Sequence, residues 1–280
     1  MSKIISFINM KGGVGKTTLC INIAYTLVKH FNKKVLIVDI DPQFNATQSL
    51  FTKFKNFTEY EKIQKKHKTI NYVLQPNIGG IAQPPANFSM GELILNLSSE
   101  EDGKLDLLPG DLEIVSFESS RRGSERILAD FLKEQLPKEG FNYDYILIDT
   151  PATYSIYSQS ALIASDFYVV PISPDVFAGL GYSLLQRVMS DDIALKGKEI
   201  KQLGIVFTLF KEGMTGREAI KKDFSENKTF ANVLHENERI KTGKMETFIY
   251  DMKRTQNDII NITQEFVELV TKMTEEGAGN

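Results

Sequence analysis

The sequence has no tryptophan, one cysteine and three histidines among its 280 residues. The lone Cys20 cannot form an intramolecular disulfide or build a cysteine-only zinc or iron–sulfur site within one chain. The histidines His30, His67 and His235 show no ligand spacing. No apolar run approaches the roughly 20 residues that span a bilayer, and the first residues enter a strand pattern rather than a signal peptide. These absences predict a cytoplasmic globular protein.

Neither sign of charge dominates the chain. Lysine and arginine number 33 against 36 aspartates and glutamates, which gives a net charge of −3. This balance excludes a protein coated in positive charge, although it permits a local basic face. Hydrophobic residues make up 42% and charged residues 25%, close to globular averages, so a disordered or fibrous chain is excluded.

Short apolar segments alternate with helical patterns along the chain. They are rich in isoleucine, valine and leucine, as in parallel strands that are buried on both faces. The predicted strands are residues 4–8, 35–40, 105–108, 145–148, 167–172 and 203–209, and the predicted helices are 18–30, 124–136, 178–195 and 257–273. Ser124 is the expected N-cap of the second helix and Pro137 its stop. The alternation predicts an α/β fold, a mostly parallel central sheet with helices on both faces.

The domain organisation follows from the same pattern. We expect one domain over residues 1–280, with a terminal helix at about 257–273 docked on the sheet. The least regular stretch, about 52–99, is rich in lysine and contains Pro84-Pro85. We interpret it as helices and loops at the sheet edge rather than a separate domain, and its lysines as a solvated face.

Residues 9–18, Asn-Met-Lys-Gly-Gly-Val-Gly-Lys-Thr-Thr, form the most specific motif. They follow the first predicted strand and open the first helix, which is the context of a P-loop. Glycines let successive backbone N–H groups turn inward as an anion nest, and the helix N-terminus adds donors. Lys16 can reach the β and γ phosphates, and the Thr17 hydroxyl can ligate Mg²⁺. The residues expected around the phosphates are Gly12, Gly13, Val14, Gly15, Lys16, Thr17 and Thr18.

Carboxylates end two further predicted strands. Asp39 and Asp41 close the segment 35–40, and Asp149 closes the apolar segment 145–148 in the Walker B manner. A carboxylate opposite a P-loop can hold Mg²⁺ through water. Ligands of open α/β sheets bind at the carboxyl ends of the strands, so the order of the three motifs indicates one nucleotide site.

The P-loop departs from the usual pattern, because Met10 replaces the first glycine and Lys11 follows it. This form, Lys-Gly-Gly-x-Gly-Lys-Thr, resembles the deviant Walker A motif of the ParA/MinD group of ATPases. The resemblance implies a Mg²⁺-dependent ATPase that forms a homodimer on ATP binding. It also implies that Lys11 crosses to the partner's nucleotide, where a cation in trans would stabilise the transferring phosphoryl group.

Individual roles are carried over from the same resemblance. It implies Lys11, Lys16 and Asp41 as catalytic residues, with Asp41 orienting the attacking water. It implies Thr17, Asp39 and Asp149 as metal-binding residues, and it places Asn237 with Arg239 where the family closes over the base. Three positions depart from the family pattern. Phe44 stands where glycine is usual, Ala152 where a second proline is usual, and His235 where the base-contacting loop usually has proline.

The chain is most similar to the short, Soj-like ParA proteins of plasmid and chromosome partition. That resemblance implies non-specific DNA binding in the ATP state, nucleoid association in the cytoplasm, and a ParB-like centromere-binding partner that stimulates hydrolysis. DNA contacts of this kind are phosphate-directed and need basic residues. The candidates are Lys211, Arg217, Lys221, Lys222, Lys241, Lys244, Lys253 and Arg254.

Other functions use the same motifs. A ParA-like ATPase could position a protein cargo instead of DNA, and the sequence leaves this alternative open. It also leaves open whether a DNA cargo would be a plasmid or a chromosome. A non-hydrolysing nucleotide-binding module is disfavoured by the intact Lys16, Thr17, Asp41 and Asp149. A MinD-like membrane ATPase is disfavoured because the polar face of 257–273 is acidic, whereas membrane-surface helices are rich in lysine and arginine. We therefore expect no membrane association.

Overall fold

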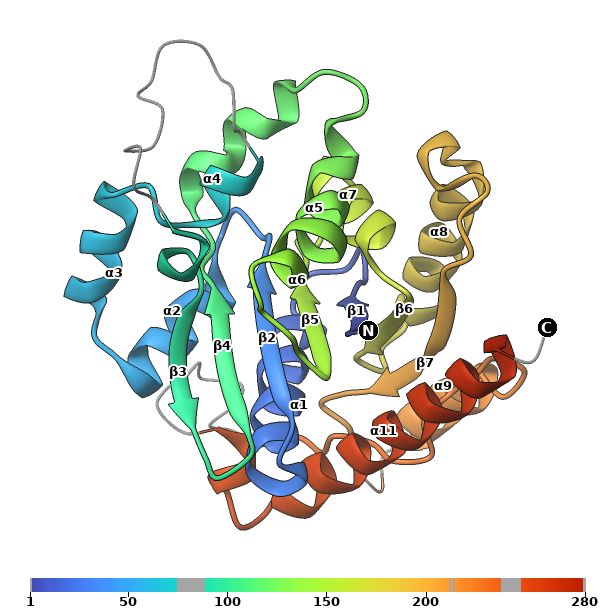
Figure 1. Ribbon diagram of the computed structural model, residues 1–280. Coiled ribbons are helices and arrows are strands. Elements are labelled where there is room, and N and C mark those ends of the chain that lie inside the picture. The colour runs from blue at the N-terminus through green and yellow to red at the C-terminus, as the bar shows by residue number, and fades with distance from the viewer. Residues whose placement is uncertain (1, 75–88, 212, 214, 238–247, 279–280) are drawn as a thin grey trace.

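A computed structural model describes residues 2–74, 89–211, 213, 215–237 and 248–278. Its described residues form a seven-stranded sheet in the order β3-β4-β2-β5-β1-β6-β7 (Figure 1). Strand β3 is antiparallel to β4, and the other pairs are parallel. The strands are β1 (Lys3–Phe7), β2 (Lys34–Asp39), β3 (Leu95–Ser99), β4 (Lys104–Leu108), β5 (Tyr145–Asp149), β6 (Phe167–Ile172) and β7 (Lys201–Phe207). A mostly parallel sheet is thus confirmed.

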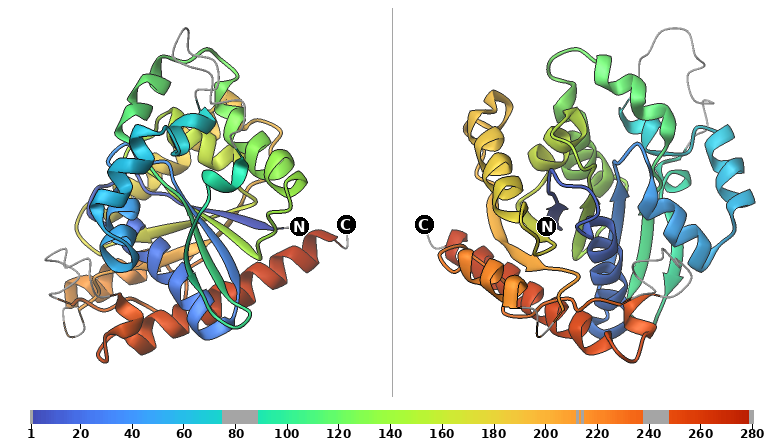
Figure 2. Two further views of the ribbon diagram at one scale, coloured as in Figure 1. Left: turned by 60° about the vertical axis from the view of Figure 1, so that its left-hand side comes forward. Right: turned by 180° about the vertical axis from the view of Figure 1, so that it is seen from behind.

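Helices cover both faces of the sheet (Figure 2). The main helices are α1 (Lys16–Phe31), α2 (Asn45–Phe54), α3 (Phe57–Lys65), α4 (Ile70–Leu74), α5 (Ile127–Asp130), α6 (Leu136–Lys138), α7 (Ile156–Ala164), α8 (Ala178–Asp191), α9 (Thr215–Asp223) and α11 (Gln256–Ala278). Shorter 3₁₀ turns are η1 (Met90–Glu92), η2 (Leu112–Ser119), η3 (Ser124–Arg126), η5 (Ile193–Leu195) and η6 (Ile249–Asp251), and η4 (Phe131–Gln135) is a π turn.

Alternate side chains of the central strands reach opposite helical layers. In β2, Val35 and Ile37 pack in the cluster that contains α1 and α11, whereas Leu36 and Val38 pack with α5 and α7. Because successive side chains of a strand point to opposite faces, a strand covered on both sides must be apolar throughout. This explains why the strands appear in the sequence as unbroken apolar runs.

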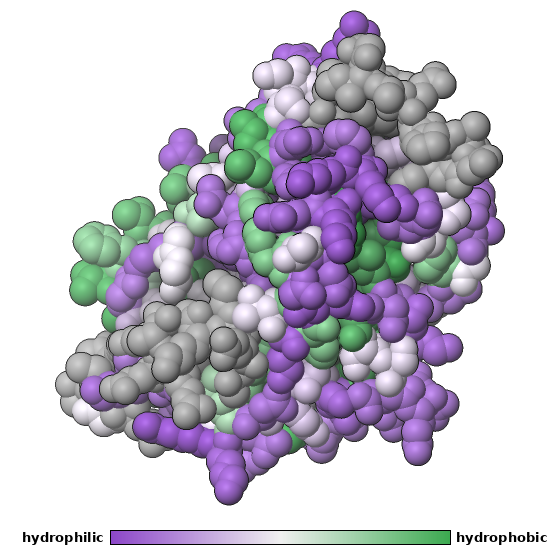
Figure 3. Space-filling view, turned by 90° about the vertical axis from the view of Figure 1, so that its left-hand side faces the viewer, coloured by the Kyte–Doolittle hydropathy of each residue, from purple (hydrophilic) through white to green (hydrophobic). Residues whose placement is uncertain are grey.

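The stretch 52–99 contains α3, α4 and a strand, β3, that the sequence did not predict. Its sequence, Leu-Asn-Leu-Ser-Ser, is polar for a strand because β3 lies at the edge of the sheet. The Asn96 amide donates to the buried Asp106 of β4 over 2.9 Å, and the register shifts between Asn96 and Ser98. The side of the molecule that carries α3 is mostly hydrophilic (Figure 3).

At the opposite edge of the sheet, a further segment of the chain lies along β7. Residues 228–236 run beside β7 and exchange backbone hydrogen bonds with it. Ile205 N donates to Lys228 O, Phe230 N to Ile205 O, and Leu234 N to Phe207 O, each over 2.8 Å. The outward backbone N–H and C=O of Ile205 and the C=O of Phe207 are therefore bonded within the chain.

Two expectations for the helix at 124–136 are wrong. Ser124 is not its N-cap, since Gly123 holds that position with φ 97° and Ser124 already belongs to the first 3₁₀ turn. Pro137 does not stop the helix, which continues to Lys138. A proline removes one helical hydrogen bond, and the preceding π turn accommodates the loss, after which Glu139 N donates to Gln135 O over 3.2 Å.

The terminal helix α11 packs its apolar stripe against the sheet. Ile259, Ile262 and Phe266 are fully buried, and the Phe266 ring lies 5.7 Å from that of Tyr145 in β5. Acidic residues of α11 also bind protein backbone: the Glu265 carboxylate accepts from Ala231 N and Asn232 N. The stripe is thus part of the core. No helix in the described part of the chain is long and apolar enough to cross a membrane.

We expect Phe266→Ala to destabilise the fold by about 3–5 kcal/mol, because it removes a fully buried ring and leaves a cavity. Urea denaturation followed by circular dichroism measures the change. Glu268→Ala, on the exposed face of the same helix, is the matched control and should change stability by less than about 0.5 kcal/mol. Equal stability of the two variants would contradict a core position for α11.

Candidate nucleotide-binding site

The predicted P-loop connects β1 to α1. Gly13 and Gly15 have φ values of 72° and 81°, which side chains other than glycine rarely adopt. Gly15 directly precedes α1, so the first free N–H groups of the helix point at the loop. The Thr208 hydroxyl, just after β7, donates to Val14 O over 2.7 Å and fixes the loop from outside. No motif in the sequence predicts this role for Thr208.

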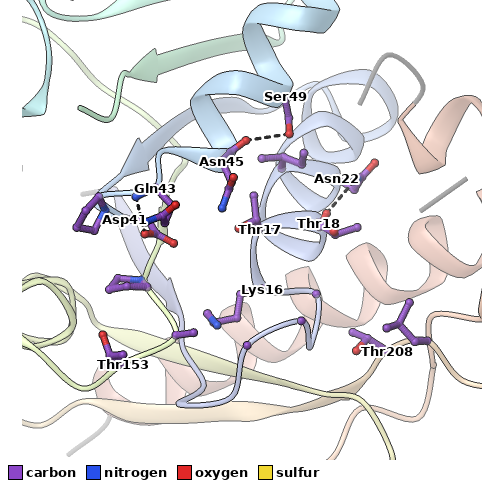
Figure 4. A pocket seen from close by; sticks show the side chains of 18 of the residues that line it. Lys16, Thr17, Thr18, Asn22, Asp41, Gln43, Asn45, Ser49, Thr153 and Thr208 are labelled. Atoms are coloured by element: carbon purple, nitrogen blue, oxygen red, sulfur yellow. Dashed lines mark hydrogen bonds between the residues drawn. The ribbon is translucent and has the colours of Figure 1, made fainter. Parts of the chain in front are cut away.

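A cavity of about 840 Å³ opens in front of this loop. Lys16 and Thr17 lie between Asp41 on one side and Thr208 on the other (Figure 4). Of the residues predicted to surround the phosphates, Gly12, Gly13, Gly15, Lys16, Thr17 and Thr18 line the cavity. Val14 is buried behind the loop instead. The volume and the inward-facing loop suit a nucleotide.

Strand register brings two of the predicted acidic residues together. Asp39 of β2 and Asp149 of β5 are paired at the same level of the sheet, and both are fully buried. The Thr17 hydroxyl donates to Asp149 Oδ2 over 2.7 Å. Asp149 Oδ1 is buried without a hydrogen-bond partner among the described residues. A hydroxyl beside a carboxylate with an unused oxygen fits Mg²⁺, which prefers oxygen ligands and retains water.

Asp39 has a different environment, which the sequence did not reveal. Its Oδ2 accepts from both the backbone N and the hydroxyl of Thr47, each over 2.8 Å. The Thr47 hydroxyl in turn accepts from Gly110 N over 2.8 Å. One oxygen of Asp39 is therefore committed to the first turn of α2. Its assignment to a magnesium-bound water remains a prediction.

Burial shifts the pKa values of Lys16 and of the acidic groups near it. Burial lowers the pKa of the Lys16 ammonium, while Asp149 and Asp41 oppose that shift. Burial also raises the pKa of Asp39 to about 7, against the hydrogen bonds from Thr47, and raises the pKa of Asp149 well above its ordinary value. Asp149 and Asp41 thus act on the Lys16 ammonium, Asp39 adds a third acidic group beside them, and a divalent cation would relieve the repulsion among the three carboxylates.

Asp41 lines the cavity from the loop between β2 and α2. Its Oδ1 accepts from Gln43 N over 2.9 Å, which orients the carboxylate. Burial raises the pKa of Asp41, and Gln43 and Lys16 oppose the shift. The position is suited to hold a water molecule at the phosphate end of the cavity.

Lys11 does not line the cavity of its own chain. Its ammonium forms an ion pair with Asp175, just before α8, and lies 5.9 Å from the centroid of the Phe177 ring. The Asp175 carboxylate also accepts from Phe177 N over 2.9 Å. Lys11 is thus held at the surface beside the start of α8.

The end of the cavity away from Asp41 is more apolar. Leu234, Phe248, Ile249 and Met252 line it, and Asn22 of α1 accepts a hydrogen bond from Ile249 N over 2.7 Å. Of these residues, the family resemblance pointed only to Ile249, in the segment that follows Asn237 and Arg239, and the sequence did not identify the others.

Asn237, which was expected to close over the base, does not line this cavity. Its amide nitrogen lies 3.5 Å from Met252 Sδ and from Thr255 Oγ1. The N–H of His235 donates to Asp258 Oδ2 over 3.0 Å, a bond that proline could not make. Arg239 lies outside the described residues.

The candidate DNA-binding residues come from several segments. Lys211 follows β7, Lys221 and Lys222 lie in the last turn of α9, and Lys253 and Arg254 precede α11. Four of these five are exposed and Lys221 is half-buried, with its ammonium 5.8 Å from the centroid of the Phe210 ring. Lys241 and Lys244 lie outside the described residues, as does the side chain of Arg217.

The fold and this cavity define a nucleotide-binding protein of the P-loop class. A family model described as an AAA domain (AAA_31) matches residues 2–201. The virulence plasmid ParA family protein pGP5-D of Chlamydia psittaci is 28% identical over 273 residues, which is 94% of this chain and 93% of the relative. The sporulation initiation inhibitor protein Soj of Bacillus subtilis is 29% identical over 249 residues, covering 86% and 87%.

A solved structure agrees with these relatives. The putative plasmid partition protein of Borrelia burgdorferi bound to AMPPNP superposes with a TM-score of 0.72 at 24% identity, over 95% of this chain and 98% of that one. The chain therefore belongs to the AAA_31 family, and ParA- and Soj-type proteins are among its relatives. The resemblance to the ParA/MinD group that its motifs carried is confirmed.

Proposed function

We propose that this protein is a Mg²⁺-dependent, ATP-dimerised ATPase that acts in plasmid or chromosome partition. In this proposal its ATP state binds DNA without sequence preference, and a ParB-like centromere-binding protein stimulates hydrolysis. The observation that carries the proposal is that the two lysines of the P-loop motif occupy different positions. Lys16 lines the cavity, whereas Lys11 lies outside it at the surface.

The chemistry follows from the positions of the side chains. Backbone N–H groups of residues 12–16 and the Lys16 ammonium bind the phosphates, and Thr17 with Asp149 would hold Mg²⁺, which neutralises charge on the β and γ oxygens. The Asp41 carboxylate accepts a hydrogen bond from the attacking water and orients it. Water displaces ADP from the γ-phosphoryl group, which yields ADP and phosphate.

Exposed apolar residues support the dimer in this proposal. Val176, Phe177, Leu180 and Leu184 are 89%, 65%, 70% and 44% exposed, and they lie on or just before α8, next to Lys11. Contiguous apolar surface on a soluble protein marks an interaction site. A second copy that covered it would bring its own Lys11 to this cavity.

DNA binding is tested by a mobility shift of a random-sequence duplex with ATP, with ADP and without nucleotide, at two salt concentrations. We expect binding only with ATP, and a steep loss as salt rises because phosphate contacts release counterions. Joint substitution of Lys221 and Lys222 by alanine should reduce the salt slope by about one per lost phosphate contact. The same change at Lys62 and Lys65 of α3 is the matched control.

The result of the DNA-binding experiment also distinguishes partition from the alternative functions. If the protein dimerises with ATP but binds no DNA in any state, the partition function is wrong, and the ATPase switch acts on a protein cargo or a membrane instead. If DNA binding ignores nucleotide, the ATP-switched model is wrong.

A further inference from the structure

The loop that carries Asp41 contains a backbone conformation that its residue does not favour. Phe44, directly before α2, has φ 39° and ψ 40°, in the left-handed region. For residues with a Cβ atom this region is strained, and glycine is its usual occupant. An aromatic residue at such a position requires compensating contacts.

Those contacts come from α3. The Phe44 ring stacks on the ring of Tyr60, with centroids 5.3 Å apart and planes inclined by 13°. Tyr60 is 2% exposed, its hydroxyl donates to Gly110 O over 3.1 Å, and its ring meets the edge of Phe51 at 5.5 Å. The Phe44 side chain is thus held against an immobile partner rather than left in solvent.

Gly110 provides the space for this arrangement. A Cβ atom at Gly110 would lie 2.8 Å from Phe44 Cβ and 2.9 Å from Asp39 Cγ, too close for either. Gly110 N also donates to the Thr47 hydroxyl. Phe44, directly before α2, and Thr47, in the first turn of α2, therefore both pack against Gly110.

The loop itself is closed around Asp41. Phe44 N donates to Asp41 O over 2.8 Å, and Gln43 N donates to Asp41 Oδ1 over 2.9 Å. Thr47 ties the first turn of α2 to Asp39, so a change of φ and ψ at Phe44 would have to be taken up by the turn at residues 41–43. The orientation of the Asp41 carboxylate thus depends on the conformation of Phe44.

We propose that Phe44 and Tyr60 are positioning residues for the ATPase reaction, whose stacked rings fix the loop that aims Asp41 at the attacking water. The proposal rests on the proposed function, because it assumes that Asp41 orients this water. The stacked rings replace the freely rotating glycine that would otherwise occupy the turn. Neither ring touches the nucleotide in this proposal.

The test compares Phe44→Gly, Tyr60→Leu and Tyr60→Phe. Hydrogen exchange of the backbone amides of residues 43–47, in the nucleotide-free protein, reports the mobility of the loop independently of hydrolysis. Single-turnover ATP hydrolysis and ATP affinity are measured in parallel. Phe57→Leu is the matched control, since Phe57 also contacts Tyr60 at 5.3 Å but is 52% exposed and lies outside the loop.

We expect Phe44→Gly and Tyr60→Leu to speed exchange and to slow hydrolysis roughly tenfold, a cost typical of a slightly misplaced group, with ATP affinity unchanged. Tyr60→Phe keeps the stacked ring but loses the bond to Gly110 O, so its effect should be smaller than that of Tyr60→Leu, whereas Phe57→Leu should behave as the parent protein. Unchanged exchange and hydrolysis in Phe44→Gly would overturn the proposal, even if Tyr60→Leu failed to fold. Faster exchange with hydrolysis that is insensitive to Asp41→Ala would instead refute the role of Asp41.

Discussion

Lys16→Ala is expected to abolish ATP-dependent dimerisation and to weaken ATP binding about 100-fold, near the upper end of what charge-assisted hydrogen bonds contribute. The side chain is 7% exposed, lines the cavity, and donates to Lys11 O over 3.2 Å across the phosphate loop. Without it, the loop loses its buried cation while Asp39, Asp41 and Asp149 remain. The phosphates would then lie near Asp41 in the cavity and the buried Asp149 behind it without a compensating ammonium.

Calorimetry of ATP binding and light scattering after gel filtration measure the two effects. Lys29→Ala is the matched control, because Lys29 lies on the same helix, pairs with Glu100 at the surface, and is remote from the loop. A Lys16→Ala protein that dimerises normally with ATP would refute the nucleotide-switched dimer.

Asp41→Ala is expected to retain ATP binding and dimerisation while turnover falls by about 100-fold or more, the range for loss of a group that positions or accepts a proton from water. Asp41 lines the cavity but is not part of the phosphate loop, so its removal leaves the phosphate donors intact. Phosphate release under single-turnover conditions measures the loss.

Two variants distinguish the charge of Asp41 from its place in the loop. Asp41→Asn keeps an oxygen that can accept from Gln43 N, so the loop should remain closed while the negative charge is lost. Asp191→Ala, at an exposed pair with Arg187 on α8, controls for the loss of a carboxylate. Normal turnover in Asp41→Ala would show that another group orients the water.

The sequence predicted those parts of the fold that depend on local pattern. Residues buried on both faces, such as 35–38, appear as apolar runs. The glycines of the P-loop indicate a backbone turn that other residues rarely adopt. Strand β3 escaped prediction because an edge strand has no such run, and polar residues such as Asn96, which pairs with Asp106, interrupt it. The helix around Pro137 was misjudged because the π turn that accommodates the proline has no local signature.

The site, like the fold, could be predicted only where a local sequence pattern defines it. Motif spacing placed Lys16, Thr17 and Asp41 at the cavity and Asp149 beneath its wall, since each follows the carboxyl end of a strand. The pairing of Lys11 with Asp175 could not be predicted, because it depends on where α8 starts relative to the P-loop. Thr47 likewise has no signature, since only the fold brings it to Asp39 and Gly110.

The two edges of the sheet are poorly suited to assembly by strand addition. Strand addition by a peptide or a further copy needs a row of free backbone donors and acceptors. At β7, Ile205 and Phe207 are already bonded to residues 228–236, and at β3 the row belongs to a five-residue strand interrupted by a register shift. We therefore expect a filament or a partner complex to grow through helical and loop surfaces, and a mutation that loosened 228–236 to expose β7 to aggregation.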